Sequence, residues 1–172
     1  FDYSTLGNLE WESINTNLYE SKTRSIINIP EDNTVNNNLL SELDELFSES
    51  SNFNKLYQNY PYDKEKYKLP SDYFKKYLGI GFSLIKDNTT FNLQPHVDNR
   101  FVFGNILINL NNNIDSTFFY KNYQDKEVVY KSPQNRGEGV FFINSEETFH
   151  SIDITQTDTR YMMFVQLLLN IL

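Results

Sequence analysis

The feature that most constrains this chain is a series of short apolar runs in its C-terminal half. Eight such runs occupy residues 80–85, 91–97, 101–110, 117–120, 127–130, 139–143, 149–154 and 161–169. Clusters of Asn, Asp, Gly, Pro, Ser and Thr separate them, and such punctuation is typical of strands joined by turns. Runs this short and this closely spaced predict a double-sheet jelly roll or a barrel, rather than alternating strands and helices.

The N-terminal part has a different pattern. A short β-like run at 23–29 is followed by apolar residues at helical spacing, which predict helical structure over 36–60. Helices often pack on one face of such a sheet. We therefore expect a mainly β (α+β) fold, in which a helical region, 1–78, supports a jelly-roll core, 79–172. Residues 1–172 are expected to form a single domain.

Composition and charge narrow the function classes. The chain has 172 residues, enough for one sizeable core, and no Cys, which excludes disulfide scaffolds and thiolate chemistry. The formal net charge of −8 disfavours binding to nucleic-acid backbones and to anionic membrane surfaces. No signal-peptide pattern is visible, and the apolar stretch at 164–169 is far shorter than a membrane span. A soluble, cytoplasmic protein is therefore expected.

The two His residues carry the most specific signal. His96 begins the sequence His96-Val97-Asp98, and His150 lies on a later predicted strand. Residues two apart on a strand project to the same face, so His96 and Asp98 can reach one ion. A second imidazole from a neighbouring strand would complete a two-His, one-carboxylate set, which is typical of non-haem Fe(II) oxygenases. By itself a His-x-Asp sequence also occurs by chance, and Asp98-Asn99 could simply be a turn.

Several further segments accompany these residues, and together they resemble the 2-oxoglutarate- and Fe(II)-dependent oxygenases. The similarity covers roughly residues 77–169 and points to a small prolyl-4-hydroxylase-like group common in bacteria and phages. The segments that carry it are 93–98 (LQPHVD), 106–111 (ILINLN), 116–119 (STFF), 137–144 (GEGVFFIN) and 150–152 (HSI). The chain departs from the usual family pattern at Asp115-Ser116, at Ser151 and at Met162.

The resemblance implies a fold, a metal and a reaction. The fold would be a double-stranded β-helix, and His96, Asp98 and His150 would be both the metal ligands and the catalytic centre for Fe(II). 2-Oxoglutarate would be a cosubstrate, converted with O2 to succinate and CO2 while a substrate is hydroxylated. Ascorbate is a further candidate cofactor. The substrate, a peptidyl residue or a small molecule, and the oligomeric state are left open.

Arg160 is the residue that the resemblance assigns to the far carboxylate of 2-oxoglutarate, because a guanidinium binds a carboxylate bidentately. It precedes the last apolar run, where Met162 and Phe164 share its face of a strand. A buried Arg needs an anionic partner. A ligand carboxylate is the expected partner, and Asp153 or Asp158 is the alternative. Further candidates for cosubstrate contacts, each also explicable as a structural residue, are Tyr77, Ser83 and Asn105.

Readings from other functional classes stay open at this point. A cupin-like or catalytically inactive jelly roll would serve as a binding module. If the His-x-Asp motif occurs here by chance, the chain would be a structural or interaction protein. Iron-dependent turnover of 2-oxoglutarate would separate the enzyme from both.

Overall fold

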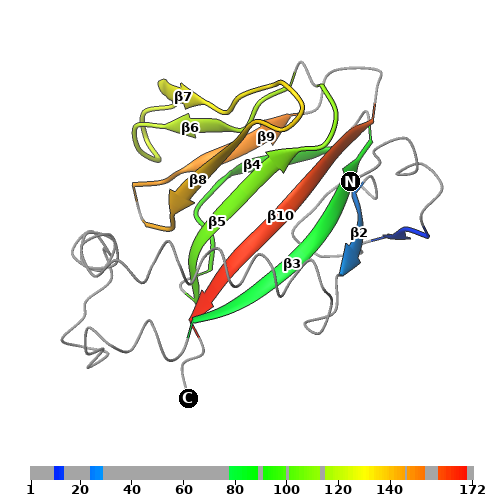
Figure 1. The fold of residues 1–172 in the computed structure, drawn as a ribbon. Helices are drawn as coiled ribbons and strands as arrows, with labels where there is room; N and C mark the ends of the chain where they lie inside the picture. Colours follow the sequence, from blue (N-terminus) through cyan, green and yellow to red (C-terminus); the bar gives the residue numbers. More distant parts are fainter. Residues whose placement is uncertain are drawn as a thin grey trace.

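Ten strands make up most of the chain that the computed structural model describes, which comprises residues 10–13, 24–28, 78–88, 91–99, 101–112, 115–145, 147–153 and 159–169 (Figure 1). In chain order they are β1 (Glu12–Ser13), β2 (Arg24–Asn28), β3 (Leu78–Asp87), β4 (Asn92–His96), β5 (Val102–Asn109), β6 (Phe118–Tyr120), β7 (Val128–Lys131), β8 (Gly139–Ile143), β9 (His150–Asp153) and β10 (Arg160–Leu169). The eight runs predicted between residues 80 and 169 correspond to β3–β10, and the run at 23–29 contains β2.

The strands form two sheets. One has six strands in the order β1-β2-β3-β10-β5-β8, and the other has four in the order β4-β9-β6-β7. Every strand pairing among the described residues is antiparallel. The last strand, β10, lies between β3 and β5, so the end of the chain completes the centre of the larger sheet (Figure 1). The predicted antiparallel jelly roll is confirmed.

The larger sheet carries apolar side chains on both faces, as the largely apolar character of β10 predicts. On one face, Val165 is fully buried and packs in a cluster with Phe82, Leu84 and Leu110. On the other face, alternate residues of β10 line a cavity between the two sheets: Arg160, Met162, Phe164 and Gln166. The period of two along a strand therefore separates a packed face from a cavity-lining face, as the sequence predicted for Met162 and Phe164.

The expected N-terminal helices lie outside the described residues, and the single-domain organisation stays a prediction. The described parts of the region 1–78 are chiefly strands. Here β2 pairs with β3, and β1, which the sequence pattern did not predict, pairs with β2. This region thus extends the larger sheet. Within the described part of the chain, no helix is long and apolar enough to cross a membrane.

Candidate active site

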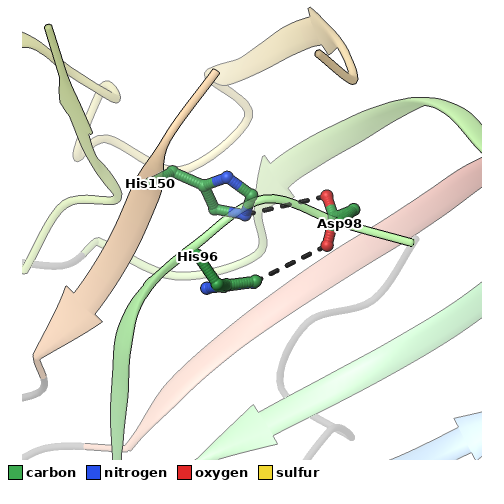
Figure 2. A group of neighbouring side chains, drawn as sticks. All are labelled: His96, Asp98 and His150. Atoms are coloured by element: carbon green, nitrogen blue, oxygen red, sulfur yellow. Dashed lines mark ion pairs between the residues drawn. The ribbon is translucent and has the colours of Figure 1, made fainter. Parts of the chain in front are cut away.

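Three side chains predicted as metal ligands meet at one side of the cavity. His96 ends β4, Asp98 follows two residues later, and His150 begins β9 (Figure 2). The register of β4 and β9 places His96 directly opposite His150. One ligating atom from each residue lies within 4.8 Å of the other two. We call His96, Asp98 and His150 the triad.

Local backbone carbonyls orient both imidazoles. His96 Nδ1 lies 2.9 Å from the carbonyl oxygen of Gln94, and His150 Nδ1 lies 2.9 Å from that of Thr148. A carbonyl oxygen only accepts, so each Nδ1 carries the proton and each Nε2 presents a lone pair. The two Nε2 atoms face Asp98 at 3.6 and 3.7 Å, which is longer than a hydrogen bond. Such carbonyl-bonded histidines are the usual form of metal-binding imidazole.

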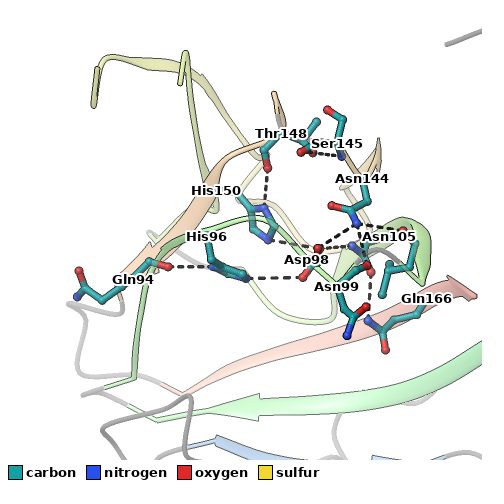
Figure 3. Close-up of polar contacts among 11 residues, drawn as sticks. Gln94, His96, Asp98, Asn99, Asn105, Asn144, Ser145, Thr148, His150 and Gln166 are labelled. Carbon is teal, nitrogen blue, oxygen red and sulfur yellow. Dashed lines mark hydrogen bonds and ion pairs between the residues drawn. The ribbon is translucent and has the colours of Figure 1, made fainter. Parts of the chain in front are cut away.

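Asp98 is held by two asparagines (Figure 3). Asn105 Nδ2 on β5 donates to Asp98 Oδ2 at 2.6 Å, and it is nearly fully buried. The amide of Asn144, just after β8, donates to the carbonyl oxygens of Asp98, Asn99 and Val102 at 3.2, 2.9 and 3.0 Å. The first contact orients the carboxylate, and the second fixes the turn between β4 and β5 that carries it.

The pKa shifts of Asp98 and His150 favour the protonation states that bind metal, whereas that of His96 favours its protonated form. Burial alone would raise the pKa of Asp98, but His96, His150 and Asn105 outweigh it and lower that pKa. Burial lowers the pKa of His150, and Asp98 only partly opposes it. Burial also acts to lower the pKa of His96, but contacts with Asp98 and Gln94 raise it overall. An ionised carboxylate beside a neutral His150 suits a divalent cation, which needs deprotonated ligands.

The donor set therefore fits Fe(II). Two imidazole nitrogens and one carboxylate are the ligands that non-haem Fe(II) sites use, and here their ligating atoms lie within 4.8 Å of one another. Aromatic rings close the site behind His150, with Phe119 and Phe142 at 5.7 and 4.9 Å between ring centroids. Metal binding itself stays a prediction.

The cavity between the sheets has a volume of about 300 Å³. Its walls are mostly apolar, and they include Ile85, Leu93, Leu107, Ile152 and Phe164. The polar groups that line it include the triad, two arginines, Asn105 and Thr117. A small concave site with apolar walls and a few convergent polar groups is typical of small-molecule binding.

Arg24, Asp87, Arg160 and Thr117 form what we call the arginine end. The Arg160 side chain is 2% exposed, and its Nη1 lies 3.8 Å from Asp87 Oδ2. Its Nη2 donates to Thr117 Oγ1 at 3.3 Å. Arg24 binds the same Asp87 through Nε and Nη2, at 2.6 and 2.8 Å. Burial lowers the pKa of Arg160 to about 10, although Asp87 opposes that shift.

The sequence-predicted residues divide into three groups. The structure brings His96, Asp98, His150, Asn105 and Arg160 to one cavity. It places Asn105 against Asp98, at 2.6 Å, and the predicted contact of Asn105 with the cosubstrate stays a prediction. Ser83 lies on β3 opposite Phe164 of β10, and Tyr77 lies outside the described residues. The roles of these residues stay predictions.

Sequence reasoning did not foresee the protein carboxylate near Arg160. It named Asp153 and Asp158 as alternatives, and Asp158 and the side chain of Asp153 lie outside what the structure describes. Among the described residues, Asp87 has a carboxylate within ion-pair distance of Arg160. It also missed Arg24, which lies in the N-terminal part. The sequence held only a weak signal for Asp87 and Arg24. Each is a charged residue at one end of an apolar run, where surface charges are common.

Comparison with known proteins identifies the architecture. No protein family and no curated protein matches the sequence. Among solved structures, a prolyl-4-hydroxylase from Pseudomonas putida superposes with a TM-score of 0.60 at 12% identity, covering 94% of this chain and 78% of that one. The chain has the prolyl hydroxylase fold.

Two further prolyl hydroxylases show the same likeness. One, from Trichoplax adhaerens in complex with a peptide fragment of the hypoxia-inducible factor oxygen degradation domain, gives a TM-score of 0.61 at 14% identity, with 96% of this chain and 73% of that one covered. The other is a viral collagen prolyl hydroxylase from Paramecium bursaria Chlorella virus-1, in complex with 2-oxoglutarate. It gives a TM-score of 0.57 at 9% identity, with 86% and 80% covered. At such identities the likeness establishes the fold.

Proposed function

We propose that the protein is an Fe(II)- and 2-oxoglutarate-dependent dioxygenase that hydroxylates an organic substrate. The observation that carries the proposal is the pairing of two sites in one cavity: a triad with both Nε2 atoms directed at one carboxylate, and a buried Arg160. The prolyl hydroxylase fold supports it, because these enzymes use that metal and cosubstrate. The same pairing argues against a purely structural jelly roll, which would not need a buried cation beside a ligand cluster.

Each part of the cavity has a defined task in this proposal. His96, Asp98 and His150 hold the metal, and Asn105 keeps the Asp98 carboxylate oriented through a 2.6 Å hydrogen bond. When bound, Fe(II) couples the oxidative decarboxylation of 2-oxoglutarate to hydroxylation of the substrate. Arg160 neutralises the far carboxylate of 2-oxoglutarate. The apolar walls exclude water, which strengthens that ion pair.

A peptidyl residue is the substrate that we propose first. The Trichoplax enzyme that shares this fold is seen with a peptide fragment, and small molecules are the second class to test. The acidic charge of −8 argues against a nucleic-acid substrate. Fe(II), O2 and 2-oxoglutarate are the proposed partners, and no described residue bears on ascorbate.

Succinate production tests the proposal directly. Purified protein is incubated with Fe(II), 2-oxoglutarate and O2, and succinate is measured with and without a chelator. We expect succinate only with protein and iron, and none from the His150→Ala variant. A screen of peptides and metabolites for a mass gain of one oxygen then identifies the substrate. A protein that binds Fe(II) but forms no succinate with any member of the screen would contradict the proposal.

A further inference from the structure

Three charged residues of the arginine end, Arg24, Asp87 and Arg160, form a row across the neighbouring strands β2, β3 and β10. Asp87, at the end of β3, is the register partner of both Arg24 on β2 and Arg160 on β10. Asp87 is fully buried, so its charge must be compensated by its neighbours. The sheet thus places one carboxylate between two guanidinium groups.

The carboxylate serves the two arginines unequally. Arg24 binds both oxygens of Asp87, at 2.6 and 2.8 Å, and its guanidinium also lies 3.9 Å over the centre of the Phe91 ring. The Nη1 atom of Arg160 lies 3.8 Å from Asp87 Oδ2, which is outside hydrogen-bond range. Because the bidentate pair with Arg24 engages both oxygens, Asp87 has little capacity left for Arg160.

Arg160 is consequently under-compensated. Its Nε has no hydrogen-bond partner among the described residues, and its contact with Thr117 is long at 3.3 Å. Its pKa is lowered to about 10, because burial and the charge of Arg24 lower it and the charges of Asp87 and Asp115 only partly offset them. A buried guanidinium in this state, lining a cavity, is suited to accept an anion from that cavity.

We propose that Arg24 is a positioning residue: it keeps Asp87 engaged, so that Arg160 stays available to a ligand carboxylate. The inference rests on the proposed function, which supplies that carboxylate. Without Arg24, Asp87 would turn to Arg160 and compete with the ligand. Arg24, on β2, is separated from β10 by the strand β3. This residue of the N-terminal part would therefore set the affinity of the cavity for 2-oxoglutarate.

A rescue experiment separates this role from direct ligand binding. Co(II)-loaded protein is titrated calorimetrically with 2-oxoglutarate and with succinate. Arg24→Met keeps an apolar side chain over Phe91 but removes the guanidinium, and we expect at least ~10-fold weaker binding, the value of one charge-assisted hydrogen bond. Adding Asp87→Asn removes the competitor and should restore the wild-type affinity. Lys86→Met is the matched control, since Lys86 is adjacent to Asp87 but does not line the cavity.

The other outcomes each overturn the inference. If the double variant stays weak, Arg24 contacts the ligand itself. If Arg24→Met lowers the melting temperature but leaves ligand affinity unchanged, its role is structural. If wild-type protein binds Co(II) but neither 2-oxoglutarate nor succinate, both the proposed function and this inference fail. If it binds these ligands and the affinity does not depend on Arg24, the inference alone is refuted.

Two milder variants cover the case in which Arg24→Met does not fold. Arg24→Lys keeps the charge but cannot bind both oxygens of Asp87, so it should weaken ligand binding less, again with rescue by Asp87→Asn. Asp87→Asn alone should bind 2-oxoglutarate at least as tightly as the wild type. Weaker binding by that single variant would show that Asp87 is needed to hold Arg160, and the inference would be wrong.

Discussion

At the triad end of the cavity the contacts that orient the two imidazoles are local, whereas at the arginine end the polar contacts join residues far apart in the chain. His96 and His150 are each oriented by a carbonyl two residues earlier. Arg24 and Asp87, in contrast, are 63 residues apart, and Thr117 and Arg160 are 43 apart. The motif His96-Val97-Asp98 indicates part of the first end, although strand register brings His150 to it. The second end forms through strand register alone.

Burial differs in the same way. The His96 side chain is 31% exposed, while those of Arg160 and Asp87 are 2% and 0% exposed. A metal site with one half-buried ligand at the cavity surface can admit the ion and reactants from solvent. A buried cation makes the other end selective, because only an anion that replaces the lost hydration binds there. The two ends should therefore respond separately to substitution.

Asp98→Asn should have the largest effect. It replaces the only carboxylate of the triad by a neutral amide of the same shape, so saturable Co(II) or Fe(II) binding should be lost in calorimetry. The loss should exceed the ~100-fold cost of removing an outer partner of a metal ligand. Asp125→Asn, at an exposed acid paired with Lys121, should leave metal affinity unchanged. Retained metal affinity in Asp98→Asn would rule out the triad as the metal site.

Arg160→Met should have the second-largest effect, and it should change the affinity for 2-oxoglutarate at the arginine end. Losing a buried charge-assisted pair typically costs ~2–5 kcal/mol, so 2-oxoglutarate affinity should fall by about 30-fold or more. Metal affinity should stay at the wild-type value. The control is Arg136→Met, because Arg136 is exposed. Equal loss of metal and ligand binding would show that the two ends are not independent.

Asn105→Ala tests which end Asn105 serves. Its 2.6 Å hydrogen bond is to the Asp98 carboxylate, so the variant should weaken metal binding by ~10- to 100-fold, as losses of outer partners do. Affinity for 2-oxoglutarate at saturating metal should change much less. A large loss of 2-oxoglutarate affinity with little change in metal affinity would instead support the cosubstrate contact that the sequence predicted for Asn105.

Thr117→Val should give the smallest effect. It removes the hydroxyl that accepts the 3.3 Å bond from Arg160 and keeps the side-chain volume. One neutral hydrogen-bond partner contributes ~0.5–1.5 kcal/mol, so 2-oxoglutarate should bind about two- to tenfold more weakly. The measurement is the same titration. An effect as large as that of Arg160→Met would mean that Thr117 contacts the ligand itself.

Much of the fold followed from the sequence because strand signals are local. Alternation and turn residues located β3–β10, and the apolar character of β10 indicated an interior strand. The same period of two placed His96 and Asp98 within reach of one ion. The N-terminal helices predicted from periodicity lie outside the described residues.

Tertiary structure, through strand register and burial, decided which side chains contact one another at the arginine end and at Asp98. Nothing in the sequence near Arg24 or Asp87 shows that β2 pairs with β3, or that both strands align with the first residue of β10. Likewise, nothing in the sequence shows that Asn105 contacts Asp98, because the turn fixed by Asn144 places Asp98 beside it. The sequence by itself indicated strands β2–β10, the three residues of the triad and the position of Arg160 on the same face of β10 as Met162 and Phe164. Only the packed sheets determined which carboxylate lies beside that cation, because pairing between distant strands depends on the alignment of the whole sheet.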